Sequence, residues 1–285
     1  MTIKKILLTL IGSLISIFFL VVIIGYFFTE SYINEKINSL RATIKTEKKI
    51  FSYNEIEDLP FLLQRYYKNT ITEGAVKPQF VRLKQTTEFK FQENSAWRKF
   101  TSEQYYSINK PGYVLTSSEI ASSLLSEKTI ESYVETKGEK LVKFLSSITT
   151  EDADGVEMNN SGLFKYFSDA VFFPSALLPS VNVKWIQVAP LIARGTFWDK
   201  NIRIGADFHF DEDGNILKIT SEDKYRITKQ GFQRSHFTIV FSDYKEFDGL
   251  KIPTSAEATW NLPGRDFLFS KYTINDLSYD IPFKY

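Results

Sequence analysis

The stretch Phe80–Phe91, which reads FVRLKQTTEFKF, alternates between mainly apolar and charged positions and decides the fold class. In an extended chain, successive side chains point to opposite faces. One face of this stretch carries Val81, Leu83, Thr87, Phe89 and Phe91, and the other carries Arg82, Lys84, Glu88 and Lys90. The pattern predicts a half-buried β-strand with one face on the core and the other in solvent.

The same two-residue period recurs along most of the following chain. It predicts further strands at Glu103–Ile108, Tyr113–Thr116, Thr129–Thr136, Lys140–Ser146, Val183–Val188, Ala193–Trp198, Ile202–Phe210, Ile216–Tyr225, Phe232–Phe241, Leu250–Trp260 and Phe267–Leu277. Lys137-Gly138, Asp211–Gly214 and Asp248-Gly249 are turn signals between some of them, because Asp and Gly accept the backbone angles of tight turns. Without a Pro-, Gly- or Ser-rich boundary, the resulting set of about twelve strands is expected to form a single domain.

Two helical segments are expected to interrupt the strands. The first begins near Asn54 or Asp58 and has Pro60 in its first turn. The second spans Gly162–Ala170 and follows the N-cap candidates Asn159–Ser161. The predicted fold class is mainly β with helical insertions (α+β), in which helices cover the concave side of one strongly curved antiparallel sheet.

Ile6–Phe28 is an apolar run of 23 residues without a charge. A helix of that length covers about 34 Å, slightly more than the roughly 30 Å hydrocarbon layer of a bilayer. Lys4 and Lys5 precede it, so the positive-inside rule predicts a cytoplasmic N-terminus and a C-terminal domain outside the cytoplasmic membrane. A cleaved signal peptide is the alternative, but the run exceeds a typical h-region and Gly25–Phe28 has no small-x-small cleavage pattern.

The chain is expected to divide into three segments. These are an N-terminal membrane anchor at residues 1–28, a juxtamembrane helical stalk at 29–53 and a β-rich domain at 54–285. Within the stalk, a narrow apolar stripe at helical spacing consists of Ile33, Ile37, Leu40 and Ile44. The stripe is typical of a solvated spacer helix, and a homodimer formed through the stalk is the alternative.

Charge and composition exclude several classes of function. The 35 Lys and Arg residues nearly cancel the 34 Asp and Glu residues, which argues against a nucleic-acid binder. The chain has no Cys and therefore no disulfide, thiolate metal site or lipid-modified cysteine. Glycine-rich phosphate loops, the G-x-S-x-G elbow and the H-E-x-x-H motif do not occur in the sequence. No cofactor is expected, and binding or interaction is favoured over catalysis.

Several phrases between residues 58 and 277 resemble a bacterial family of membrane-attached proteins of unknown function. They are Leu59-Pro60 with Arg65-Tyr66, Trp97–Tyr106, Phe173–Ser180 with Trp185, Phe208–Gly214, and Phe241–Tyr244 through Asp248–Thr254. That family carries no established activity, so the resemblance implies no catalytic residue.

The last phrase is also similar to the outer-membrane lipoprotein-sorting proteins of the localisation pathway. The similarity consists of Asp243-Tyr244 at a strand end, then Asp248-Gly249, then Ile252–Thr254. Those proteins share a half-open antiparallel barrel whose concave apolar face is covered by helices and accepts acyl chains. The resemblance implies a half-barrel here, and lipid binding by analogy of fold.

Six residues are candidates for contact with a lipid or another apolar ligand. They are Tyr105, Tyr106, Phe172, Phe173, Leu177 and Leu178. The last four belong to the Pro-bounded segment FFPSALLPS, which favours a cover draped over the sheet. Adjacent strand residues point to opposite faces, so one of the two tyrosines is expected to line a cavity and hold the polar head of the ligand. Core packing with a buried hydroxyl bond is the alternative.

Asp207, His209 and Asp211 alternate along one predicted strand and share a face. One imidazole and two carboxylates suit a metal site or an acid–base pair, whereas an outward polar face opposite Phe208 and Phe210 is the alternative. The predicted function is therefore a membrane-anchored extracytoplasmic protein that binds a lipid or other apolar ligand. A membrane-surface enzyme using these three residues and a ligand-free envelope interaction module are the alternatives.

Overall fold

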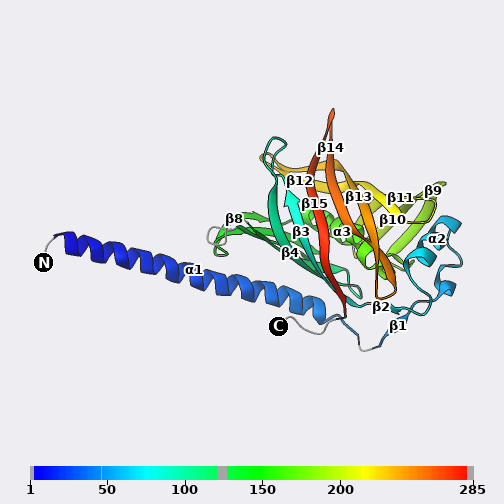
Figure 1. Ribbon diagram of the computed structural model, residues 1–285, viewed down its shortest axis with the longest axis horizontal. Helices are drawn as coiled ribbons and strands as arrows, with labels where there is room; N and C mark the ends of the chain where they lie inside the picture. Colours follow the sequence, from blue (N-terminus) through cyan, green and yellow to red (C-terminus); the bar gives the residue numbers. More distant parts are fainter. Residues whose placement is uncertain (1–2, 46, 121–126, 281–285) are drawn as a thin grey trace.

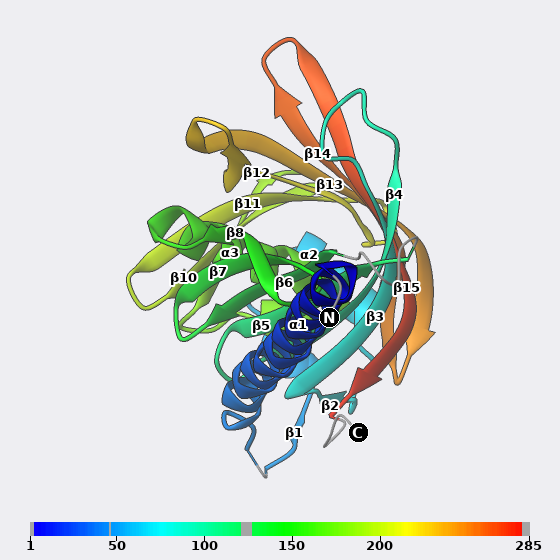
Figure 2. The same cartoon turned by 90° about the vertical axis from the view of Figure 1, so that its left-hand side faces the viewer.

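Within the described residues, thirteen antiparallel strands form one strongly curved sheet (Figures 1 and 2). The computed structural model describes residues 3–45, 47–120 and 127–280. The strands are β3 (Phe80–Phe89), β4 (Arg98–Ser107), β5 (Gly112–Glu119), β6 (Glu127–Val134), β7 (Lys137–Phe144), β8 (Ile148–Ala153), β9 (Val183–Ala189), β10 (Ile192–Asp199), β11 (Ile202–Phe210), β12 (Ile216–Thr228), β13 (Gly231–Phe247), β14 (Leu250–Leu262) and β15 (Arg265–Tyr279). A separate two-stranded sheet pairs β1 (Lys49–Ile50) with β2 (Val76–Lys77). The expected fold class, mainly β with an open curved antiparallel sheet, is confirmed.

The strand order explains where the helical insertion lies. The order is β8-β7-β6-β5-β4-β3-β15-β14-β13-β12-β11-β10-β9, so β3 pairs with β15 in the middle and β8 and β9 form the edges. The chain between these two edges contains α3 (Val156–Asp169) and two 3-10 helices, η2 (Ala170–Phe172) and η3 (Pro174–Leu177). Because this segment must pass from one edge to the other, it crosses the inner face, where α3 contacts β6, β7, β11 and β12.

The turn between β6 and β7 differs from the predicted one. Glu135 and Thr136 form it with φ values of 52° and 71°, whereas Lys137 and Gly138 are already paired in β7. Gly138 is required for another reason. A Cβ atom there would lie 2.0 Å from the carbonyl oxygen of Met158, so the glycine lets the backbone of α3 rest directly on the sheet.

β8 was not among the predicted strands, and α3 begins at Val156 rather than at Gly162. The β8 sequence ITTEDA is mostly exposed and has no apolar face, which removes the periodic signal. Asn159 and Ser161 lie inside α3 and bond to the sheet instead of capping the helix. The backbone N–H of Gly138 donates to Asn159 Oδ1 (2.7 Å), and that of Tyr225 donates to Ser161 Oγ (3.0 Å).

Aromatic side chains fill the space between the helices and the inner face. Phe167 on α3 lies 5.3 Å from the ring of Phe197 and 5.2 Å from that of Phe208, measured between ring centroids. The first predicted helix appears as the 3-10 helix η1 (Tyr53–Ile56) and α2 (Phe61–Thr70). Its Tyr66 packs against Phe210 at 5.5 Å. The same core includes Tyr106 of β4 and Tyr133 of β6, so inward strand residues of both halves of the sheet contribute to it.

A single long helix, α1 (Ile3–Arg41), contains both the apolar run and the first part of the expected stalk. It is the one helix of the described chain that is long and apolar enough to cross a membrane. Its C-terminal part packs on the outer face of β4, β5 and β6, where Ile33, Ile37 and Leu40 are buried with Tyr105 and Val114. These three residues of the stripe thus contact the sheet of their own chain, whereas Ile44 lies beyond the end of α1 and is exposed. The homodimer through the stalk stays a prediction.

Candidate functional site

Tyr105 and Tyr106 point to opposite faces of β4, as the alternation of a strand requires. Tyr105 faces α1 on the outer side, and its hydroxyl donates to Glu103 Oε1 at 2.7 Å. Tyr106 lies on the inner face, where its hydroxyl is 2.6 Å from Gln104 Oε1 and 2.7 Å from Asp169 Oδ2. Burial, reinforced by the charge of Asp169, raises the pKa of Tyr106 well above its ordinary value. Its hydroxyl therefore stays protonated.

The segment that contains Phe172, Phe173, Leu177 and Leu178 lies across the inner face and is buried. Its backbone is fixed by three hydrogen bonds from side chains. Tyr67 Oη (2.5 Å) and Trp185 Nε1 (2.8 Å) donate to the carbonyl of Leu177, and Tyr279 Oη donates to that of Phe172 (2.7 Å). All four apolar side chains belong to the main hydrophobic core. The segment covers the inner face, and its side chains are occupied by protein contacts.

Replacing Leu178 with Trp tests this packing. Leu178 is only 8% exposed, and the added volume has to be accommodated among buried neighbours. We expect a loss of about 2 kcal/mol in the free energy of unfolding, measured by denaturant titration of the full chain. An unchanged free energy of unfolding would contradict this packing and would indicate free space next to Leu178.

Charged side chains gather on the inner face beside α3. Lys165 Nζ lies 2.6 Å from Asp169 Oδ2, and the hydroxyl of Tyr113 donates to Glu131 Oε1 at 2.6 Å. Lys224 has no ion pair with any residue that the structure describes, and its Nζ lies over the rings of Phe164 and Phe237 at 5.6 and 5.4 Å.

These charges act on one another. Burial lowers the pKa of Lys224, and the charge of Glu131 opposes that effect. Burial also acts to raise the pKa of Glu131, but the charges of Lys224 and Lys165, together with the hydrogen bond from Tyr113 and the charge of Lys140, hold the pKa below its usual range. Lys224 and Glu131 therefore each influence the charge state of the other across the inner face.

Beyond this charged group the inner face is less covered. Thr87, Leu115, Thr129 and Val142 are half-buried and lie on the inner faces of β3, β5, β6 and β7. They lie toward the end of the strands at which the turns 90–97, 145–147 and 263–264 join β3 to β4, β7 to β8 and β14 to β15 (Figure 1). This end of the strands is here named the mouth edge, as distinct from the edge strands β8 and β9. The inner surface near the mouth edge is thus a mixture of apolar and hydroxyl side chains.

One turn of the mouth edge, 145–147, lies beside the apolar part of α1. The hydroxyl of Ser147 donates to the carbonyl of Val22 at 2.7 Å, and that of Thr29 donates to the carbonyl of Ser146 at 2.6 Å. A Cβ atom at Gly25 would lie 2.6 Å from Cβ of Ser147, so the glycine permits this contact. The turn 145–147 is therefore fixed against the last turns of the apolar run.

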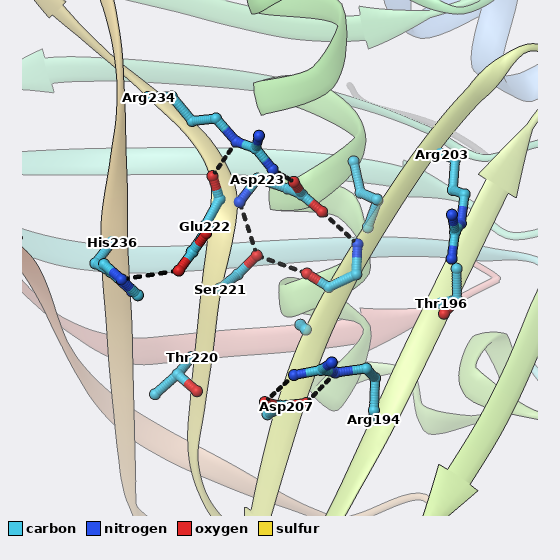
Figure 3. A pocket seen from close by; sticks show the side chains of 13 residues that line it. Arg194, Thr196, Arg203, Asp207, Thr220, Ser221, Glu222, Asp223, Arg234 and His236 are labelled. Carbon is cyan, nitrogen blue, oxygen red and sulfur yellow. Dashed lines mark hydrogen bonds and ion pairs between the residues drawn. The ribbon is translucent and has the colours of Figure 1, made fainter.

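A polar cavity of about 460 Å³ lies on the outer face of β10 to β13 (Figure 3). Its ionisable lining comprises Arg194, Arg203, Asp207, Glu222, Asp223, Arg234 and His236. Arg194 forms two bonds with Asp207, both of 2.6 Å. His236 Nε2 lies 2.8 Å from Glu222 Oε1. The sequence analysis gave an outward face for Asp207 as the alternative to a metal or acid–base site, and it did not anticipate the cavity.

Asp207, His209 and Asp211 do not converge on one point. Asp207 binds Arg194, and His209 Nε2 lies 3.3 Å from Thr220 Oγ1. Asp211 accepts from the backbone N–H groups of Asp213 (3.0 Å) and Asn215 (2.7 Å) and so fixes the turn after β11. Burial lowers the pKa of His209, Lys218 adds to this effect, and Asp207 opposes it. No cluster of three or more metal-ligating side chains occurs within residues 3–45, 47–120 and 127–280.

Residues 49–272 match the model of a family of unknown function, DUF6544. The chain belongs to this family. Among curated proteins, none matches it significantly. The resemblance to a family of unknown function that the sequence indicated is therefore confirmed.

Solved structures with a similar fold share little sequence with the DUF6544 chain. A DUF1329 family protein from Desulfovibrio piger has 12% identity and a TM-score of 0.44, covering 73% of this chain and 88% of its own. A domain assigned to outer-membrane lipoprotein sorting, from Vibrio parahaemolyticus, has 11% identity and a TM-score of 0.40, covering 78% and 92%. A LolA superfamily protein from Nitrosomonas europaea has 10% identity and a TM-score of 0.46, covering 78% and 93%. The likeness concerns the fold alone.

Proposed function

We propose that this DUF6544 protein is a membrane-anchored binding protein whose half-barrel accepts an amphiphilic lipid from the adjoining bilayer. The apolar run of α1 is the anchor, and the half-buried inner surface near the mouth edge is the binding surface. The observation that carries the proposal is the contact between the mouth edge and the end of the apolar run.

The length of α1 supports this arrangement. A helix needs about 20 residues to cross the hydrocarbon layer. A span that starts just after Lys4 and Lys5 therefore ends close to Val22 and Gly25, where the turn 145–147 is bonded to the helix. The mouth edge would then lie at the bilayer surface, so a lipid could reach the inner face without crossing water.

The composition of the inner face supports an amphiphilic ligand. Leu115 and Val142 offer apolar contact, and Thr87 and Thr129 offer hydroxyl groups. Deeper in the sheet, Lys224 is a cation without an ion-pair partner among the described residues, which suits the polar or anionic end of a ligand.

The buried segment at residues 172–178 favours the second candidate, an envelope interaction module without a ligand. There the inner face is filled by the chain itself. The two candidates differ only in whether the surface near the mouth edge takes up lipid.

A bulky side chain at position 129 should distinguish the lipid-binding protein from the interaction module without a ligand. Thr129 is half-buried on the inner face of β6, and Trp at this position would occupy the surface proposed for the lipid. We expect the Thr129→Trp variant to lose several-fold in lipid crosslinking to β3–β7 peptides. The measurement uses the full chain in nanodiscs with a photoreactive phospholipid, followed by mass spectrometry of the crosslinked peptides.

Thr101→Trp is the matched control, because Thr101 is exposed on the outer face of β4. It should crosslink as the unmodified protein does. Absence of crosslinks to inner-face residues of the unmodified protein, or an equal yield in both variants, would reject lipid uptake and favour the interaction module.

A further inference from the structure

The cavity on the outer face exists because β11 and β12 separate. Their ladder joins Asp207–Phe210 to Ile216–Thr220 and does not continue beyond it. Beyond Thr220, side chains of β12 form hydrogen bonds with the backbone of β11 in place of backbone groups. Asp223 Oδ2 accepts from the N–H of Gly205 (2.7 Å), and Ser221 Oγ donates to its carbonyl (2.6 Å). Figure 3 shows these bonds across the gap.

A second cavity of about 210 Å³ adjoins the first. It shares Arg203, Asp223 and Arg234 with the larger cavity and also touches Asn160 on α3. The opening between the strands therefore extends from the outer face toward the helix on the inner face.

Most of the carboxylate oxygens in the cavity already have partners. Both carboxylate oxygens of Asp207 accept from Arg194, at 2.6 Å each. Asp223 accepts from Gly205 with one oxygen and from Arg234 with the other, at 2.7 and 2.5 Å. Glu222 Oε1 faces His236, and its backbone carbonyl accepts from Arg234 Nε at 2.8 Å.

Several guanidinium N–H groups in the cavity have no partner among the described residues. The side chain of Arg203 forms no hydrogen bond or ion pair with any residue in the part of the chain that the structure describes, and its guanidinium lies 5.6 Å from the ring centroid of Trp198. Arg194 and Arg234 use Nε and one terminal nitrogen each, which leaves the Nη1 group of both without a bond among the described residues. In Figure 3 all three side chains line the same space.

We propose that this cavity binds a phosphate group. A guanidinium group donates in a planar fork that matches the oxygens of phosphate, and it is weakly hydrated. Three arginines on three different strands surround the space, and the oxygens of a tetrahedral phosphate can accept from several directions at once. A planar carboxylate presents two oxygens and matches this arrangement less well. Stacking on Trp198 holds Arg203 in place before the ligand arrives.

Calorimetric titration of the full chain in detergent with inorganic phosphate, in a chloride buffer, tests the site. The unmodified protein should bind phosphate, and Arg203→Gln should weaken the affinity about tenfold or more, as expected for loss of a charged hydrogen-bond partner. Arg203 is exposed and carries no structural bond to a described residue, so the variant should fold and unfold as the parent does.

Arg265→Gln is the control, since Arg265 is an exposed arginine at the turn between β14 and β15 and pairs with Glu93 at 2.9 Å. It should keep the parent's affinity. No binding of phosphate by the unmodified protein, or an equal loss in both variants, would overturn the proposal.

The phosphate could belong to a soluble ester or to a lipid headgroup. Repeating the titration in nanodiscs of phosphatidylcholine, with and without phosphatidic acid, distinguishes these sources. Loss of inorganic phosphate binding in the presence of phosphatidic acid identifies the headgroup, and unchanged binding identifies a soluble ester. Both results retain the site, which is independent of lipid uptake at the inner face.

Discussion

Replacing Asp169 with Ala should destabilise the protein by about 3 kcal/mol. The carboxylate of Asp169 is 7% exposed and accepts from both Lys165 and the hydroxyl of Tyr106. Its removal leaves the ammonium group of Lys165 without its partner in a largely buried position. The loss should appear as a lower free energy of unfolding in a denaturant titration of the full chain.

A double variant, Lys165→Met with Asp169→Leu, is the control. It removes both charges together and replaces them by apolar side chains of similar length, so most of the stability should return. A double variant as unstable as Asp169→Ala would contradict the explanation by an unpaired charge. It would assign the effect to the hydrogen bond with Tyr106 instead.

The second large effect is expected at Gly138. A Cβ atom there would lie 2.0 Å from the carbonyl oxygen of Met158 and 2.5 Å from its carbonyl carbon. Backbone atoms cannot turn aside as a flexible side chain can, so α3 would have to move off β7. We expect Gly138→Ala to cost about 3 kcal/mol of unfolding free energy, the upper end of the range for overpacked sites.

Gly205→Ala provides the comparison for this change. Gly205 is also a strand glycine, but its nearest neighbours to an added Cβ lie 3.8 Å away, an ordinary contact distance. Its free energy of unfolding should change far less than that of Gly138→Ala. Equal losses in the two variants would mean that the contact between Gly138 and α3 is not what matters.

Much of the sheet could be predicted because burial repeats on one face of each strand. The strand Ile202–Phe210 has the same limits in the sequence analysis and in the structure, since every second residue is buried. β8 lacks such a face and was missed. The start of α3 was missed because Asn159 bonds to the backbone of Gly138, a residue of another element, and no local pattern reports that contact.

The polar cavity could not be predicted for a similar reason. Arg194, Arg203 and Arg234 come from three strands, and no spacing in the sequence relates them. Their proximity depends on the register of β10 to β13 and on the irregularity of β12 between Ser221 and Lys224. The sequence shows only that each of the three strands has an arginine at an outward position.

The pairing of β3 with β15 has a consequence for how the chain acquires its structure. Strands β3 to β8 can form one meander and β9 to β15 another, each from neighbours in sequence. The two meanders meet along the seam between β3 and β15, so that seam closes only when the residues of β15 have emerged from the ribosome or translocation channel. Contacts of such high sequence separation form slowly, and until then β3 presents an unpaired edge on which chaperones or misdirected strands can act.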